Sequence, residues 1–392
     1  MTLAQRQRAL DEALAAFRPL WHAQPFREIR PAWCARWPAL TAELLALGDA
    51  EQRHLADDGE AAAHFVARHI GELAGLPELA RVAACPSAAM PDPGPFWSWE
   101  IPGRKQEQIV AFAASAARSG RPVIDWCGGK GHLGRLLALH WQVAVTTLEI
   151  DRILCADGAL LAHRSSALQH FVETDVTQTE SPTLPTGRHV VALHACGHLH
   201  RQLVEQAAAC GTVALDLAPC CYYRGIGDDY RPLSGKLRTP VAADDARLAV
   251  TEAVTAAPRR LRQRDREMAW KLGFDAWRRQ VGGYHDYRSF KPVPAAWMRG
   301  RFADFMVLMT QREGLALPAA CLLGELEERG WQRQREVMRL SIVRNAFRRP
   351  LEVWLALDLA VRLENDGYAV TLGRFCERRL TPRNLLISAR LN

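Results

Sequence analysis

From about residue 100 onward, short apolar runs alternate with longer amphipathic ones, and this alternation restricts the fold more than any other feature. The candidate strands read PVIDW, VAVTTLEI, FVETDV, HVVALHA and TVALDLA, and the candidate helices read GHLGRLLALHW, DGALLAHRSSAL and HLHRQLVEQAAAC. The short runs fit buried strands, whereas the longer runs place apolar residues on one helical face. The pattern predicts a parallel sheet with helices on both faces, which is the doubly wound α/β class.

The segments around this sheet differ in composition and suggest a domain organisation. We expect residues 1–90 to form an N-terminal helical domain, because their apolar residues recur at three- and four-residue steps. The proline-rich segment 91–100 is expected to be a linker. Residues 101–232 would then form the first part of the sheet domain, residues 233–340 an arginine-rich helical insertion, and residues 341–392 the last helix and strands.

The C-terminal residues indicate that the chain returns to the sheet. A strongly periodic helix has Pro350 in its first turn and Gly367 as its stop. Two strand-like runs follow this helix, YAVTLGRF and RNLLISARL. We therefore expect the last strands to join the sheet that begins near residue 121.

Composition bounds the class of protein without identifying it. The hydrophobic fraction of 48% and the charged fraction of 24% are those of a globular chain. The sequence has neither an apolar run of about 18 residues nor a signal-peptide core, so we expect a cytoplasmic protein that does not span a membrane. Its ten cysteines are spread along the chain and are expected to be reduced thiols. Only five of the 50 basic residues are lysine. This bias permits nucleic-acid binding but also arises in GC-rich genomes.

A glycine turn follows the first predicted strand. The strand ends at Asp125, and Gly128, Gly129 and Gly131 precede the next helix. Glycine lets the backbone approach a ligand closely, and the N-terminus of the helix adds a positive field. In the dinucleotide-binding fingerprint the acid follows the glycines, but here it precedes them, where it could face an ammonium group. This order favours S-adenosylmethionine, whose aminoacyl part carries an ammonium.

Two further acids end the next two predicted strands. Glu149 lies 24 residues after Asp125, where it could accept hydrogen bonds from ribose hydroxyls, and the neighbourhood of Asp175 could meet the adenine. Each acid alone could be a solvated strand end or a helix cap, but three in register with a glycine turn predict an S-adenosylmethionine pocket. The candidate cofactor-binding residues are Asp125, Cys127, Gly129, Lys130, Gly131, His132, Leu133, Glu149, Ile150, Asp175, Val176 and His194.

Histidines and cysteines follow the fourth and fifth predicted strands. Because ligands bind outside the carboxyl ends of parallel strands, both groups should face the methyl donor. Three interpretations stay open: a metal site formed by Cys196, Cys220, Cys221 and a histidine, a thiolate nucleophile as in RNA cytosine-5 methyltransferases, and a general base, either His194 or a tyrosine, beside an apolar cysteine wall. We assign no metal, because the sequence has no CxxC motif and adjacent cysteines rarely bind one ion.

Together these motifs resemble the methyltransferase-like protein 25 family, which includes proteins labelled ribosomal RNA adenine dimethylase domain-containing. The resemblance also includes Arg104–Lys105 before the first strand, Pro232–Leu233–Ser234, Leu357–Asp358 and the segment Thr381–Asn384, and it runs from about residue 100 to 392 with gaps. It implies a class I methyltransferase fold, which is a Rossmann-like doubly wound sheet, and S-adenosylmethionine as cofactor. The reaction face that it implies consists of Lys105, His194, Cys196, Cys220, Cys221 and Tyr222.

The cysteine pair is also similar to that of the tRNA 2′-O-methyltransferase acting on the acceptor stem, which points to an RNA substrate. Two departures from the family pattern matter: Cys127 replaces the first glycine of the turn, and His198 stands where an acid is usual.

Arginines interleaved with aromatic residues suit phosphate contacts and base stacking, but they also fit a solvated helix face over a tryptophan core. The candidate substrate-binding residues are Arg259, Arg260, Arg278, Arg279, Tyr284 and Arg383.

The sequence therefore predicts an S-adenosylmethionine-dependent methyltransferase that modifies structured RNA, either tRNA or rRNA. One alternative is a methyltransferase for proteins or small molecules. Another is a non-catalytic cofactor-binding module of a complex, because no complete catalytic motif is present.

Overall fold

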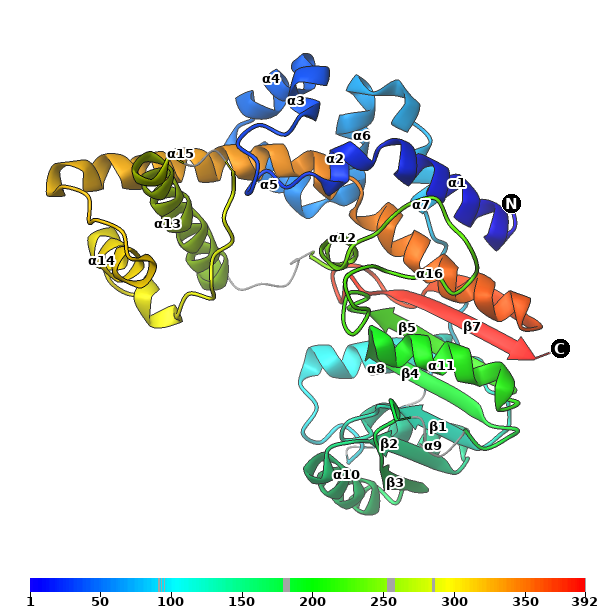
Figure 1. Ribbon diagram of the computed structural model, residues 1–392. Coiled ribbons are helices and arrows are strands. Elements are labelled where there is room, and N and C mark those ends of the chain that lie inside the picture. The colour runs from blue at the N-terminus through cyan, green and yellow to red at the C-terminus, as the bar shows by residue number, and fades with distance from the viewer. Residues whose placement is uncertain are drawn as a thin grey trace. The chain divides into compact units, whose positions relative to one another are not determined.

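The computed structural model describes residues 1–391, apart from Pro91, Pro93, Pro95 and the segments 179–183, 252–257 and 284–285 (Figure 1). Contacts divide the chain into two compact units. Unit 1 consists of residues 1–16, 75–254 and 348–392, and unit 2 consists of residues 17–74 and 255–347. Among the described residues, no helix is both long enough and apolar enough to cross a membrane.

Unit 1 is built around a seven-stranded sheet in the order β3-β2-β1-β4-β5-β7-β6. The first five strands are parallel, and β7 runs antiparallel to both β5 and β6. This architecture confirms the predicted doubly wound α/β class. The strands are β1 Val123–Trp126, β2 Val145–Glu149, β3 Gln169–Glu173, β4 His189–Cys196, β5 Ala214–Cys220, β6 Tyr368–Arg374 and β7 Leu385–Leu391.

Helices of unit 1 cover the sheet. The helices α8 and α9 pack on each other, and α9 also contacts β1 and β2, whereas α11 and α16 pack on each other and on the strands from β4 to β6 (Figure 1). The chain order reverses between β1 and β4, and ligands of such sheets bind at the carboxyl ends of the strands at this point. The helices are α1 Leu3–Ala16, α7 Leu76–Ala80, α8 Gly103–Ser115, α9 His132–Trp141, α10 Arg152–Arg164, α11 His198–Ala209, α12 Ala243–Leu248 and α16 Arg348–Asn365.

A buried carboxylate on α16 holds the loop that follows β5. Asp358 is fully buried and accepts hydrogen bonds from the Tyr230 hydroxyl (2.7 Å), the Leu233 amide (2.9 Å), and the amide and hydroxyl of Ser234 (2.8 and 2.7 Å). An ionised carboxylate offers about four acceptor sites, so this one is saturated. Two motifs that lie far apart in the sequence, around residues 232–234 and 357–358, therefore meet in one structural bond network.

The first helix, α1, belongs to unit 1 because a second buried acid anchors it there. Asp11 accepts hydrogen bonds from the amides of Arg238 (2.7 Å) and Thr239 (3.1 Å) and from the indole of Trp354 (3.2 Å). The middle of the N-terminal segment packs instead within unit 2. The units thus differ from the expected domains, since residues 1–90 are split between them and residues 255–347 share a unit with residues 17–74.

Unit 2 is organised by two long helices, α13 and α15. A Cβ atom added at Gly330 would meet the Ala269 carbonyl oxygen at 2.2 Å, so glycine is what permits the close approach of these helices. Trp270, Phe274 and Phe305 pack in the core beside them. The helices of this unit are α2 Arg18–His22, α3 Trp33–Arg36, α4 Pro38–Ala46, α5 Asp49–Asp57, α6 Gly59–His69, α13 Pro258–Gly282, α14 Phe302–Glu313 and α15 Ala320–Asn345, with short 3₁₀ turns at Gly71–Leu73 and Ala295–Met298.

Candidate active site

The turn between β1 and α9 has an unusual backbone. Cys127, Gly129 and Gly131 have φ angles of +53°, +59° and +61°, which is the left-handed region. Glycine adopts this conformation without penalty, whereas the cysteine is strained by about 1–2 kcal/mol. A Cβ atom at Gly128 would lie 2.3 Å from Oδ2 of Asp125, so only glycine lets the turn pass over that carboxylate. The free amides at the start of α9 follow directly and suit a carboxylate ligand.

Asp125 is the buried acid beneath this turn. Its Oδ2 accepts hydrogen bonds from the Gly134 amide (3.2 Å) and the Thr147 hydroxyl (3.3 Å). Burial raises the pKa of Asp125 to about 6, and the nearby Lys105 ammonium opposes the shift. A carboxylate that is desolvated in this way is stabilised by a cationic ligand. The residues therefore fit the aminoacyl part of S-adenosylmethionine, whose ammonium would be held by Asp125.

Glu149, at the end of β2, stabilises the same turn by hydrogen bonding. Its Oε2 accepts a hydrogen bond from the Gly129 amide (2.9 Å), and its Oε1 accepts from the amides of Ile150 and Asp151 (both 3.0 Å). Of the four acceptor sites of a carboxylate, one remains for a ribose hydroxyl. The side chain of Ile150 is 62% exposed next to it, as expected of an apolar residue that an adenine ring would cover.

Two residues predicted for the cofactor are engaged elsewhere. The Lys130 ammonium lies 2.9 Å from the Asp157 carboxylate and 3.2 Å from that of Glu100, so it belongs to an ion-pair cluster. Asp175 lies two residues beyond β3 and accepts hydrogen bonds from the amide and hydroxyl of Thr177 (2.9 and 2.7 Å), which lower its pKa. Val176 is buried beside it.

Other polar residues support the turn, although no local sequence signal distinguishes them. Gln169 donates hydrogen bonds to the Gly131 carbonyl (2.9 Å) and the Thr147 hydroxyl (2.8 Å).

The fully buried Arg135 donates to the Trp97 carbonyl (2.8 Å). It also lies 2.8 Å from the ring of His132. Burial, followed by the charge of Arg135, lowers the pKa of His132 to about 4. His132 is therefore neutral at pH 7. Leu133, the next residue, is buried.

A β-bulge places His194 at the end of β4. Leu193 pairs with Ala218 and Cys196 pairs with Cys220, so β4 has one more residue than β5 between these pairs. His194 takes up the extra residue with a left-handed φ of +64°. Bulges of this kind redirect a side chain and are common next to active sites.

The imidazole of His194 is neutral and has an unused acceptor. Burial lowers its pKa to about 4, and the charges of Lys105 and Arg383 lower it further. Its Nδ1 atom is buried and has no hydrogen-bond partner among the described residues. A neutral imidazole with an unused ring nitrogen is able to accept a proton.

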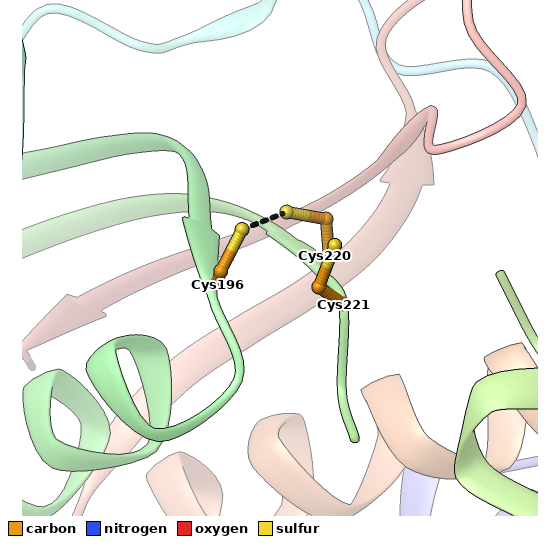
Figure 2. Close-up of side chains that lie close together, drawn as sticks. All are labelled: Cys196, Cys220 and Cys221. Carbon is orange, nitrogen blue, oxygen red and sulfur yellow. Dashed lines mark hydrogen bonds between the residues drawn. The ribbon is translucent and has the colours of Figure 1, made fainter. Parts of the chain in front are cut away.

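Three thiols lie together where β4 and β5 end (Figure 2). The sulfurs of Cys196 and Cys220 are 3.3 Å apart, and the Cys220 thiol also donates to the His194 carbonyl (3.3 Å). Hydrogen bonds from these two thiols, with the charge of Arg224 nearby, lower the pKa of Cys221, while the pKa values of Cys196 and Cys220 are raised. The charges of the three thiols therefore depend on one another.

Tyr222 does not reach the reaction face. Its side chain is fully buried, its ring contacts His200 edge-on with centroids 5.4 Å apart, and burial raises its pKa well above the usual value. This burial does not favour the catalytic role that the sequence predicts for Tyr222.

Two cations complete the site. Lys105, on α8, lies near Asp125 and Cys220, and burial lowers its pKa. Arg383 donates a hydrogen bond to the Val250 carbonyl and acts electrostatically on His194. The structure thus brings the predicted residues Lys105, Asp125, His194, Arg383 and the three cysteines to one edge of the sheet.

The predicted substrate arginines of unit 2 divide into two kinds. Arg278 is only 2% exposed and is bound by Asp275 (2.7 Å), which also holds Arg279 (2.6 Å). The carboxylate of Asp275 already occupies these guanidinium groups, and the substrate-binding role expected of Arg278 does not fit its burial. Arg259 and Arg260 are exposed, and Tyr284 lies outside the described residues.

The Asp125→Asn substitution should weaken the binding of S-adenosylmethionine by roughly 10- to 100-fold, since a charge-assisted hydrogen bond contributes about 1.5–3 kcal/mol. Titration calorimetry would measure the loss. Asp157→Asn is the matched control, because Asp157 is half exposed and, among the residues that the structure describes, pairs with Lys130 alone. Equal affinity of the Asp125→Asn variant and the wild type would contradict the assignment.

The same carboxyl makes cofactor binding depend on pH. The pKa of Asp125 in the folded protein, about 6, lies above its ordinary value of 3.8. Protonation of this carboxyl therefore stabilises the folded state at low pH, and this stabilisation is lost as the pH rises through the interval between the two values. Only the ionised form attracts the ammonium. Cofactor affinity should therefore fall as the pH falls below about 6, and it should not do so in the Asp125→Asn variant.

Comparison with known proteins agrees with this geometry. Residues 104–224 match the model of a methyltransferase domain family. This segment includes β1 to β5, the glycine turn and all three thiols. Fold and site together define a class I methyltransferase domain with S-adenosylmethionine as its cofactor. The protein is an S-adenosylmethionine-dependent methyltransferase.

Two solved structures show distant similarity. The 23S rRNA methyltransferase ErmE is 13% identical, with 60% of this chain and 97% of that chain covered and a TM-score of 0.24. Coclaurine N-methyltransferase, bound to N-methylheliamine and SAH, is 12% identical, with 88% and 90% covered and a TM-score of 0.27. Both TM-scores are too low to assign a shared substrate. No curated protein matches the chain.

Proposed function

We propose that this methyltransferase modifies structured RNA, either tRNA or rRNA, and that it is related to the methyltransferase-like protein 25 family. The observation that carries the RNA substrate is a basic cavity of about 620 Å³ in unit 2. The cavity is lined by Arg259, Arg262, Gln263, Asp265, Arg266, Ala295, Met298, Arg299 and Trp331.

The chemistry of this cavity favours a polyanion with aromatic bases. The exposed guanidinium groups of Arg259, Arg262 and Arg299 form no hydrogen bond or ion pair within the described part of the chain. Arg266 lies over the ring of Trp270 at 5.5 Å, and its Nε atom is buried without a partner among the described residues. Unpaired arginines suit bidentate phosphate contacts, and a tryptophan in the lining suits base stacking.

The reaction face supports general-base catalysis over the alternatives. When bound, the cofactor supplies an electrophilic methyl group. We propose that the neutral imidazole of His194 accepts the proton of the attacking hydroxyl or amine group, while Lys105 and Arg383 add positive charge nearby. A nucleophilic role for Cys220 is less favoured, because its thiol is 4% exposed, donates to a carbonyl and has a raised pKa. A cytoplasmic location, where thiols stay reduced, is supported by ten free cysteines.

Replacing Arg262 and Arg299 together with glutamine should weaken RNA binding and lower the slope of log K against log salt by about two, one for each phosphate contact. Filter binding of bulk tRNA at several salt concentrations measures both quantities. Arg335→Gln is the control, because Arg335 already pairs with Glu328 at 3.2 Å. An unchanged slope in the double variant would show that the cavity does not contact phosphates.

Transfer of labelled methyl groups to RNA and protein fractions from a strain lacking the gene tests the substrate class. Label in a discrete RNA is expected. Label in protein alone would overturn the RNA proposal, and no label despite cofactor binding would indicate a non-catalytic module.

A further inference from the structure

The three thiols at the end of β4 and β5 have the spacing of a ligand set. Their sulfur atoms all lie within 4.8 Å of one another, and the closest hydrogen-bonded pair, Cys196 and Cys220, is 3.3 Å apart (Figure 2). Tetrahedral zinc with Zn–S bonds of about 2.3 Å places neighbouring sulfurs about 3.8 Å apart. The Cys196–Cys220 separation is 0.5 Å shorter than this value and none exceeds 4.8 Å, so small side-chain rotations suffice to reach it.

The backbone explains how adjacent cysteines come to face the same point. Successive residues of a regular strand point to opposite faces of the sheet, so Cys220 and Cys221 would normally diverge. Cys221 instead has a left-handed φ of +43°, and the bulge at His194 shifts Cys196 into register with Cys220. A left-handed non-glycine residue costs about 1–2 kcal/mol, and strain of this kind is concentrated at functional sites.

The charges around the thiols suit a cation as well. Three thiolates within 4.8 Å of one another would repel strongly, and a divalent cation between them would offset that repulsion. A divalent ion would allow all three to ionise, which leaves a net charge of −1. Arg224 and Arg383 both act electrostatically on Cys221 and would balance that charge.

We propose that Cys196, Cys220 and Cys221 bind one thiophilic divalent cation of the zinc type. Three protein ligands leave the fourth coordination position open for water or a substrate atom, as in catalytic zinc sites. This proposal differs from the expectation of no metal, which rested on the rarity of adjacent cysteine ligands. It is independent of the RNA proposal, because the site lies within unit 1 and its test does not measure methyl transfer.

Titration of the reduced, full-length protein with Co²⁺ tests the site directly. We expect one ion per chain, with the near-ultraviolet absorption of thiolate–cobalt charge transfer and the visible bands of a tetrahedral ion. Cys196→Ser, Cys220→Ser and Cys221→Ser should each weaken these bands. Cys321→Ser is the control, since Cys321 is exposed on α15 and outside the cluster. S-Adenosylmethionine binding by each variant verifies that it is folded.

Alkylation of the wild-type protein keeps the proposal testable even if a variant misfolds. With one equivalent of Zn²⁺, mass spectrometry should show all three cysteines protected from iodoacetamide together, and a chelator should restore their reactivity. Failure to bind Co²⁺ or Zn²⁺ stoichiometrically, or equal binding in the serine variants, would overturn the proposal. So would a Cys196–Cys220 disulfide that forms in air with the metal present, because it would identify the cluster as a redox pair.

Discussion

Replacing His194 with asparagine should lower the rate of methyl transfer by roughly 10²- to 10⁴-fold, the usual contribution of a general base. Asparagine tolerates the left-handed backbone that the bulge requires, so the variant removes the proton acceptor without new strain. Affinity for S-adenosylmethionine should change by less than about twofold, because the acids that hold the cofactor belong to β1 and β2. Single-turnover kinetics with saturating cofactor would isolate the chemical step.

His198→Asn is the matched control, since His198 lies four residues along the chain and is exposed at the start of α11. With saturating cofactor at every pH, the wild-type rate should show no acid limb between pH 5 and 8, because the pKa of His194 is lowered to about 4 and the base stays neutral throughout. A His194→Asn variant with full activity would rule out the proposed base. The cysteine cluster would then be the next candidate for the catalytic group.

The Asp358→Ala substitution should lower the free energy of unfolding of unit 1 by about 3–5 kcal/mol, which is a large part of the stability of a typical domain. The substitution would leave four buried donors from Tyr230, Leu233 and Ser234 without an acceptor. Urea denaturation followed by circular dichroism measures the loss. Limited proteolysis should detect early release of the loop around residue 233.

Asp366→Ala is the control for this experiment, because Asp366 makes a partly exposed ion pair with Arg362 near the end of the same helix. Such a pair contributes less than about 1 kcal/mol. A similar small loss in the Asp358→Ala variant would mean that the loop is held by packing rather than by the carboxylate.

Much of the sheet was predictable because each strand is a local signal. The runs read from the sequence correspond to all seven strands within two or three residues, with β3 shifted toward the N-terminus and β5 toward the C-terminus. The two final strands join the sheet as expected. The glycines and the acids at the strand ends also predicted the turn above Asp125. Only glycine fits at position 128, because a Cβ atom there would collide with the Asp125 carboxylate.

Features that depend on distant partners were not predictable. The bulge at His194 arises from how β4 pairs with β5, and no propensity within LHAC marks it. The periodic helices before residue 90 show an apolar face but not its partner, so α1 could not be assigned to the sheet unit. Arg278 belongs to the same arginine-rich segment as the exposed Arg259 and Arg260, yet it pairs with Asp275 and its guanidinium lies over the Phe290 ring.

The discontinuous course of unit 1 bears on how the protein is made. Strand β5 is complete at residue 220, but its neighbour β7 spans Leu385–Leu391, and unit 2 supplies most of the intervening chain. During translation, the hydrogen-bonding edge of β5 must therefore wait for more than 160 further residues, and unpaired edges of this kind favour aggregation. Expression at lower temperature, or with chaperones that cover nascent strands, should raise the yield of folded protein more than codon changes that speed elongation through residues 221–384.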